Sequence, residues 1–223
     1  SRHYKKLILV LNCGSVMDLS ILDEIRIDAV LFYGQGGMEG GNALADILTG
    51  KATPCGKLTD TWAYRYEDYP SADTFGYRNG NLDDEEYTEG IYVGYRWFDK
   101  QKIAPRYPFG YGLSYTTFRR DVMEATNDHV TVSVTNTGDI PGKETLLLCI
   151  HKPDGRLDHE EKALVAFAKT KTLAPGESQS IMVPIDLKNI AKDLNLRQNT
   201  ASVRLGRLRE RLREFLMKEG YVY

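Results

Sequence analysis

The sequence predicts an α/β domain with a mainly parallel sheet and covering helices, followed by an incomplete antiparallel β-sandwich and a helical tail. Short apolar runs at residues 6–11 and 29–33 each precede a segment with helical periodicity, in the β-α-β-α order of a parallel sheet. Three later segments alternate apolar and polar side chains, as half-buried antiparallel strands do: residues 129–136, 144–151 and 179–185. From residue 188 onward, apolar side chains instead recur at helical spacing.

The composition is that of a folded chain with no bias toward nucleic acid or membranes. Of 223 residues, 42% are hydrophobic and 27% are charged, and the formal net charge is -2. This charge gives no general attraction to polyanions. No apolar run approaches the roughly 18 residues of a membrane helix, so no membrane partner is expected. The N-terminus lacks the zones of a signal peptide and looks truncated, and a cytoplasmic location is expected.

The cysteines do not indicate a disulfide framework or a metal site. Cys13, Cys55 and Cys149 are odd in number and far apart, which favours reduced, buried thiols. None lies near a histidine at metal-ligand spacing, so we expect no metal and no cofactor.

A glycine-rich turn follows the second apolar run. Five glycines occupy residues 34–41, where the chain must turn sharply. Asn42 is expected to cap the following helix and Gly50 to end it. The spacing matches neither common phosphate-binding pattern, and Glu39 adds a negative charge, so a glycine turn that packs tightly is favoured over a phosphate site.

This stretch resembles the C-terminal α/β domain of family 3 glycoside hydrolases, the β-glucosidase family. The residues that match the family pattern are Gly34, Glu39, Gly40, Gly41, Asn42, Ala43, Ala45, Asp46, Leu48, Gly50, Pro54, Gly56, Lys57 and Leu58. Two later segments also match family signatures: YTEGIYVGYRWFD at residues 87–99 and PFGYGLSY at residues 108–115. The resemblance therefore implies that residues 1–118 form this domain, truncated at its N-terminal side.

Several residues of these signatures are expected to shape the domain rather than to perform chemistry. They are Gly40, Gly41, Asp46, Arg96, Gly110 and Gly112. The two glycines of PFGYG are expected to allow a tight turn. Arg96 is expected to hold the carboxylate of Glu89 or Asp99. The alternation of side chains within residues 87–99 predicts a strand.

An aromatic-rich loop at residues 62–81 is a candidate wall of a sugar cleft. Aromatic faces can stack on sugar rings, and Trp62, Tyr77 and Glu89 are the candidate cleft residues. The alternative is that these aromatic side chains pack the loop onto its own domain.

Residues 119–187 resemble part of the fibronectin type III-like module that follows the α/β domain in many family members. The resemblance lies in Asn136-Thr137-Gly138 and in residues 173–178. A complete module has about seven strands. At most five can be placed before residue 187, and the closing strands of the family pattern are missing.

Residues 188–223 resemble the helix-turn-helix of region four of extracytoplasmic-function sigma factors, which makes the chain a predicted chimaera. Arginines surround an apolar stripe. The stripe is formed by Ala201, Leu205, Leu208, Leu212 and Phe215. A basic helix after a short first helix suits major-groove docking, so residues 195–218 are a candidate nucleic-acid site. The alternative is a solvated amphipathic helix.

The family resemblance implies retaining hydrolysis of terminal, non-reducing β-linked sugars without a cofactor, on a β-linked oligosaccharide or glucoside. It also implies that no catalytic residue lies in this chain. The nucleophilic aspartate belongs to a (β/α)8 barrel and the acid/base glutamate to a loop upstream of Leu7, so Glu39 and Glu89 receive no catalytic role. A fragment without these parts is expected to be inactive alone. The alternatives are a DNA-binding or regulatory protein led by its tail, and a non-catalytic carbohydrate-binding module.

Overall fold

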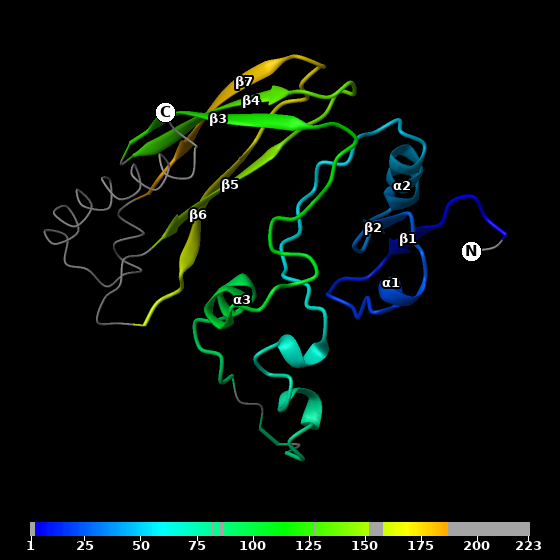
Figure 1. Ribbon diagram of the computed structural model, residues 1–223, viewed down its shortest axis with the longest axis vertical. Helices are drawn as coiled ribbons and strands as arrows, with labels where there is room; N and C mark the ends of the chain where they lie inside the picture. Colours follow the sequence, from blue (N-terminus) through cyan, green and yellow to red (C-terminus); the bar gives the residue numbers. More distant parts are fainter. Residues whose placement is uncertain (1–2, 82, 85–86, 127, 152–157, 187–223) are drawn as a thin grey trace, which may run out of the picture. The chain divides into compact units, whose positions relative to one another are not determined.

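The computed structural model describes residues 3–81, 83–84, 87–126, 128–151 and 158–186 (Figure 1). The chain forms two compact units. The first comprises Ser1–Ala52, Lys57–Gly112 and His159–Glu161, and the second comprises Thr53–Gly56, Leu113–Asp158 and Lys162–Tyr223. The predicted helix-turn-helix at residues 195–218 lies outside the described residues. In the part of the chain that is described, no helix is both long and apolar enough to cross a membrane.

The first unit begins with the predicted β-α-β-α order. Strand β1 (Ile8–Leu11), helix α1 (Ile21–Glu24), strand β2 (Ala29–Phe32) and helix α2 (Gly40–Leu48) follow one another in the chain. The two strands pair in parallel, with Ile8 opposite Ala29 and Leu11 opposite Phe32. Among the described residues, this parallel sheet has only these two strands (blue in Figure 1).

The two strands are less buried than their apolar sequences predict. Leu11 is 7% exposed, but Ile8 and Phe32 are 45% and 38% exposed. The prediction that residues 6–11 are buried on both faces is therefore wrong for this structure, because a two-stranded pair with short helices leaves much of its apolar surface uncovered. The buried centre of the unit is formed by Leu11, Leu19 and Trp62.

The rest of the first unit consists of loops and short helical turns. Two 3₁₀ turns, η1 (Tyr66–Asp68) and η2 (Phe75–Tyr77), precede helix α3 (Tyr95–Gln101). The strand predicted within residues 87–99 is wrong. Gly90 and Gly94 have φ angles of 58° and 60°, which interrupt an extended backbone, and a helix begins directly after the second glycine.

The second unit is built from five antiparallel strands. They are β3 (Phe118–Ala125), β4 (His129–Asn136), β5 (Thr145–His151), β6 (Lys162–Lys169) and β7 (Ser178–Pro184). One sheet has the order β3-β4-β7, and the other is the pair β5-β6. The three strands predicted from alternation correspond to β4, β5 and β7. Among the described residues of the second unit there are thus five strands, the largest number that the sequence allows before residue 187.

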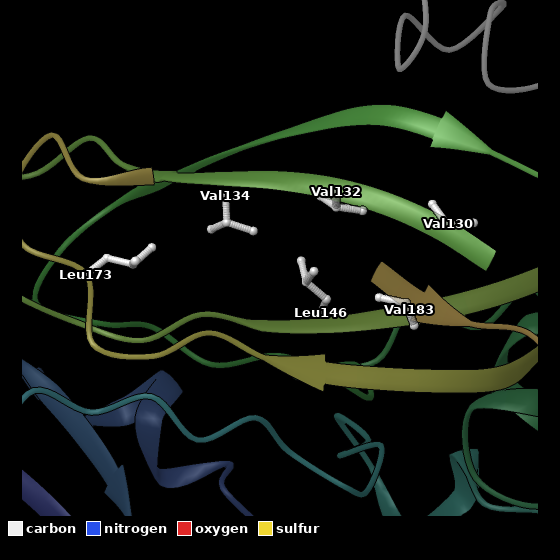
Figure 2. Close-up of a cluster of buried hydrophobic side chains, with 6 residues drawn as sticks. All are labelled: Val130, Val132, Val134, Leu146, Leu173 and Val183. Carbon is white, nitrogen blue, oxygen red and sulfur yellow. The ribbon is translucent and has the colours of Figure 1, made fainter. Parts of the chain in front are cut away.

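The two sheets share one hydrophobic core. The valines of β4 lie on one face, as their alternation predicts, and all are at most 8% exposed. Figure 2 shows them in one cluster with side chains from β5, β7 and the segment before β7: Val130, Val132, Val134, Leu146, Leu173 and Val183.

Candidate functional site

The glycine-rich turn after β2 is filled by the side chain of Tyr33. A β-carbon added at Gly36 would lie 2.0 Å from the Tyr33 hydroxyl oxygen, and one added at Gly40 would lie 1.9 Å from it. These two positions therefore need glycine so that the phenol ring can fit. Gly41 has no atom within 4 Å of an added β-carbon, so contact does not explain the glycine there. The turn thus holds its own tyrosine hydroxyl, in agreement with the packing interpretation.

Helix α2 begins earlier than the sequence predicts. Its first residue is Gly40, and Glu39 precedes it, so Asn42 lies in the first turn and the prediction of Asn42 as the cap is wrong. The Asn42 amide instead donates a hydrogen bond of 2.6 Å to Oε2 of Glu39. Gly50 ends the helix with a φ of 76°, as predicted.

Asp46 has a local structural role on α2. Its Oδ1 lies 3.0 Å from Nζ of Lys51, and its carbonyl oxygen accepts a hydrogen bond of 2.9 Å from the Ala52 amide. Both contacts stabilise the chain where it leaves the helix.

Two family signatures that are far apart in the sequence lie side by side. The Leu58 amide donates to the Tyr111 carbonyl oxygen and the Gly110 amide donates to the Leu58 carbonyl oxygen, both at 2.8 Å. Nζ of Lys57 donates to the Gly112 carbonyl oxygen at 2.7 Å. Gly110 has a φ of 81°, so the predicted tight turn does require glycine at that position.

Trp62 lies in the core of the first unit. It is 3% exposed, and its ring meets that of Phe32 edge-on at a centroid distance of 5.4 Å. Its amide donates a hydrogen bond of 2.8 Å to the carbonyl oxygen of Tyr107. In this structure its indole is therefore not accessible for stacking on a sugar.

The aromatic loop contains both packed and exposed rings. The Tyr69 hydroxyl donates to the Thr61 carbonyl oxygen at 3.2 Å, and its ring contacts that of Phe98. Burial raises the pKa of Tyr69 above its ordinary value. In contrast, three other rings are 43–59% exposed: those of Tyr64, Tyr66 and Phe75. The side chain of Tyr77 lies outside the described part of the chain.

Glu89 and Arg96 belong to the segment that leads into α3, but they do not form an ion pair. Nη1 of Arg96 donates to the Ile91 carbonyl oxygen at 3.3 Å, and the guanidinium lies 5.8 Å from the centroid of the Tyr95 ring. Within the described residues, Arg96 has no carboxylate partner, so the predicted pairing with Glu89 or Asp99 is wrong. The helical backbone that begins at Tyr95, in place of a strand, accounts for the different direction of this side chain.

A charged contact that no sequence motif indicates joins α1 to the segment before β3. Nη1 of Arg106 donates to Oδ1 of Asp23 at 3.0 Å, and Nη2 donates to Oδ2. The Arg106 side chain is only 8% exposed and lies 4.5 Å from the centroid of the Tyr64 ring. The hydrogen bonds from Arg106 lower the pKa of Asp23 below its ordinary value. No sequence pattern links two residues separated by 83 positions.

Candidate metal ligands are not gathered in the described residues. Within them, no group of three or more histidine, cysteine, aspartate and glutamate side chains is placed to hold a metal ion. The three cysteines are half-buried and form no disulfide with one another.

Comparison with known proteins finds a family model that matches the first part of the chain. Residues 1–95 match the family model described as the glycosyl hydrolase family 3 C-terminal domain. This part of the chain is thus similar to a family 3 C-terminal domain. The turn around Tyr33 and the whole aromatic loop, residues 62–81, belong to the matched residues. The β-sandwich follows it in the chain.

The proteins most similar to this chain include several β-glucosidases. A β-glucosidase of Ruminococcus albus is 40% identical over 193 residues, which cover 85% of this chain and 20% of the relative. Thermostable β-glucosidase B of Acetivibrio thermocellus is 33% identical over 96% of this chain and 29% of its own length. The structure of β-glucosidase 3B from Thermotoga neapolitana in complex with glucose has a TM-score of 0.75 and 38% identity, over 85% of this chain and 27% of that one.

The alignments cover only part of the length of each relative. The chain spans between a fifth and a third of the length of these three β-glucosidases. The region aligned with the R. albus enzyme includes most of the sandwich, because 85% of the chain extends well beyond residue 95.

Proposed function

We propose that this chain is the non-catalytic portion of a β-glucosidase-type glycoside hydrolase that removes terminal, non-reducing β-linked sugars. The observation that carries the proposal is the 38% identity and TM-score of 0.75 to a β-glucosidase structure over 85% of the chain. The substrate of the complete enzyme is then a β-linked glucoside or oligosaccharide. The 223 residues contribute a scaffold beside the cleft, and the catalytic carboxylates belong to the unmatched barrel and the loop upstream of β1.

The positions of the carboxylates within the signatures support this division of roles. Glu39 is exposed and accepts a hydrogen bond from Asn42, three residues away. Glu89 lies at the start of the turn in which its carbonyl oxygen accepts a hydrogen bond from Tyr92. Retaining glycosidases need two carboxyl groups about 5 Å apart on opposite sides of the scissile bond. The side chain of Glu39 therefore has a local role without such chemistry, whereas Oε2 of Glu89 is buried without a hydrogen-bond partner.

A domain exchange tests the proposal. The region of T. neapolitana β-glucosidase 3B that this chain matches is replaced by residues 7–186 of the chain. We expect the hybrid to hydrolyse an aryl β-glucoside at a rate within about tenfold of the parent, because the catalytic groups remain in the parent part. A folded hybrid that binds glucose but has no measurable turnover would refute the proposal.

The proposal also covers the architecture of the sheet and of the five-stranded unit in a complete enzyme. In a complete enzyme, the β1-β2 pair forms part of a larger, mainly parallel sheet with covering helices. The five-stranded unit corresponds to a fibronectin type III-like module. The Asn136-Thr137-Gly138 sequence, which carried that resemblance, lies at the end of β4, where Asn136 is fully buried.

The tail from residue 188 remains a candidate nucleic-acid-binding segment because of its resemblance to sigma region four. The A. thermocellus alignment covers 96% of this chain and therefore extends into the tail, which favours a hydrolase origin over a chimaera. Titration of a labelled DNA duplex tests whether the tail binds DNA. Binding that disappears when residues 188–223 are removed would favour the regulatory alternative.

The cytoplasmic location also remains a proposal.

A second candidate function is non-catalytic sugar binding by the aromatic loop. Phe75 favours it most, because this residue is 59% exposed, while the rings of Tyr64 and Tyr66 each lie against an arginine. Calorimetric titration with cellobiose checks this candidate. A loss of binding in Phe75→Ala and not in Phe167→Ala, a residue of β6 that is 72% exposed, would support it.

A further inference from the structure

Asn79 and Gly80 form an exposed turn within the aromatic loop. Gly80 has a φ of 79°, and both residues are exposed. A β-carbon added at Gly80 would meet no atom within 4 Å, so the space beside the turn is open. Asn79 is the only asparagine of the 223 residues that a glycine follows. The amide nitrogen that follows the Asn79 side chain thus has no β-carbon beside it to shield it.

The side-chain amide of Asn79 is held in a defined turn. Its Oδ1 accepts a hydrogen bond of 3.0 Å from the Asn81 amide. This Asx-turn closes a ring that contains both Cγ of Asn79 and the Gly80 amide nitrogen. Asn81 repeats the arrangement, since its Oδ1 accepts hydrogen bonds from the Asp83 and Asp84 amides at 2.9 and 3.2 Å. Two consecutive turns therefore keep the carbonyl group of the Asn79 side chain directed at a backbone donor.

The Asn81 amide is placed as an oxyanion donor for an attack on Cγ of Asn79. When the Gly80 nitrogen bonds to Cγ, negative charge develops on Oδ1, and a hydrogen bond donated to that oxygen stabilises the charge. Holding the two reacting atoms in one small ring also lowers the entropic cost of the attack. Among the hydrogen bonds between described residues, none is donated by the Gly80 amide, so its proton can pass directly to solvent.

We propose that Asn79 is a site of spontaneous deamidation through a cyclic imide, with water as the co-reactant, and that the Asn81 amide promotes the reaction. A base in the solvent takes the Gly80 amide proton while the nitrogen forms a bond to Cγ of Asn79. The Cγ–Nδ2 bond then breaks, Nδ2 takes up a proton, and ammonia leaves. Water opens the imide at either carbonyl carbon, which gives aspartate or isoaspartate at position 79. No group is oxidised or reduced.

The modification changes the aromatic loop in two ways. A carboxylate replaces a neutral amide, which adds one negative charge to the formal net charge of -2, close in the sequence to Asp83 and Asp84. In the isoaspartate product the main chain also gains one carbon, because the backbone then runs through Cγ. This chemistry needs only the loop itself, so it goes beyond the proposed function and does not depend on it.

The test follows the folded 223-residue chain during incubation at mildly alkaline pH. Peptide mapping by mass spectrometry measures the amide lost at each asparagine, and an isoaspartyl methyltransferase quantifies isoaspartate. We expect Asn79 to react at least about tenfold faster than Asn12, which is also exposed but precedes Cys13. A rate at Asn79 no higher than that at Asn12 would overturn the proposal, as would aspartate formation without isoaspartate.

Two substitutions at position 81 separate the effect of the hydrogen bond from that of the Asn-Gly sequence. Asn81→Pro removes the N–H that donates to Oδ1, whereas Asn81→Ala keeps it and is the matched control. In the folded chain, the proline variant should react about tenfold more slowly at Asn79 than the alanine variant, because the developing charge loses its donor. Circular dichroism verifies that both variants are folded.

The same two variants unfolded in urea correct for any intrinsic effect of proline on the reaction. Without the turn, the difference between their rates at Asn79 should largely disappear. A ratio of the two rates that is the same in the folded and unfolded chains would overturn the role of the Asn81 amide.

Discussion

Asn136 is the residue whose side chain joins most of the loops at one end of the sandwich. It is fully buried, and its Nδ2 donates to the carbonyl oxygens of Ile140 and Leu173 at 2.9 and 2.8 Å. Its Oδ1 accepts hydrogen bonds from the Thr116 hydroxyl at 2.6 Å and from the Gly138 amide at 3.1 Å. All the hydrogen-bonding capacity of one amide is thus used inside the protein.

Replacement of this side chain should destabilise the second unit. Asn136→Ala leaves buried donors and acceptors without partners, and we expect the free energy of unfolding to fall by about 2–3 kcal/mol. Urea unfolding followed by circular dichroism provides the measurement. Asn12→Ala, at an exposed position, is the control and should change stability by less than about 0.5 kcal/mol. Equal effects of the two substitutions would show that the buried amide network is not stabilising.

The Asp23–Arg106 contact should make stability depend on pH in the acid range. Hydrogen bonds from Arg106 lower the pKa of Asp23 in the folded chain, relative to about 3.9 in an unfolded chain. The contribution is therefore fully present above the unfolded pKa and is lost as the pH falls through the lower, folded value.

Unfolding curves between pH 7 and pH 2.5 test this dependence. Asp23→Asn should remove part of the loss of stability below about pH 4, since the amide cannot be protonated in that range. Asp73→Asn, at an exposed position, should leave the acid profile unchanged. If both variants follow the original profile, Asp23 does not contribute to acid sensitivity.

At the scale of elements, the fit of Tyr33 into the glycine turn sets the geometry between β2 and α2. A β-carbon at Gly40 would meet mainly the hydroxyl oxygen at 1.9 Å, with the next ring atom at 3.1 Å. A β-carbon at Gly36 would also meet ring carbons, at 2.4 and 2.9 Å. Removal of the hydroxyl should therefore relieve the first clash but not the second.

This difference can be measured with double substitutions. Gly40→Ala and Gly36→Ala should each destabilise the chain by about 1–3 kcal/mol, as overpacking does. When Tyr33→Phe is added, it should restore most of the stability that Gly40→Ala loses and little of the stability that Gly36→Ala loses. Gly41→Ala, where the added β-carbon meets nothing within 4 Å, is the matched control within the same turn. Equal rescue of both variants would show that the ring does not occupy the turn as described.

Local periodicity and glycine spacing were enough to predict β1, β2, α2 and the three valines of β4. These features depend on neighbours in the sequence, and each short segment carries its own pattern. The prediction failed at residues 87–99, where alternation favoured a strand, because the positive φ angles of Gly90 and Gly94 outweigh side-chain pattern. The pairing of Arg106 with Asp23 and that of Leu58 with Tyr111 are set by the tertiary fold, so a single sequence gives no signal for them.

Among the candidate cleft residues, the sequence could not distinguish buried from exposed aromatics. Trp62 and Tyr64 are two positions apart in the same loop, yet their side chains are 3% and 49% exposed. Which ring enters the core depends on the contacts of Trp62 with Leu11 and Leu19, which come from other parts of the chain. Aromatic composition therefore identified the loop but not the residues available to a ligand.

For the whole molecule, the central claim is that the 223 residues carry the scaffold of a β-glucosidase without its catalytic carboxylates. Turnover of an aryl β-glucoside by the purified chain tests this claim most directly. We expect a rate indistinguishable from that of buffer, since loss of one catalytic carboxylate already lowers the rate by orders of magnitude. Turnover that disappears in Glu39→Gln or in Glu89→Gln, while the folded state is retained, would contradict the claim.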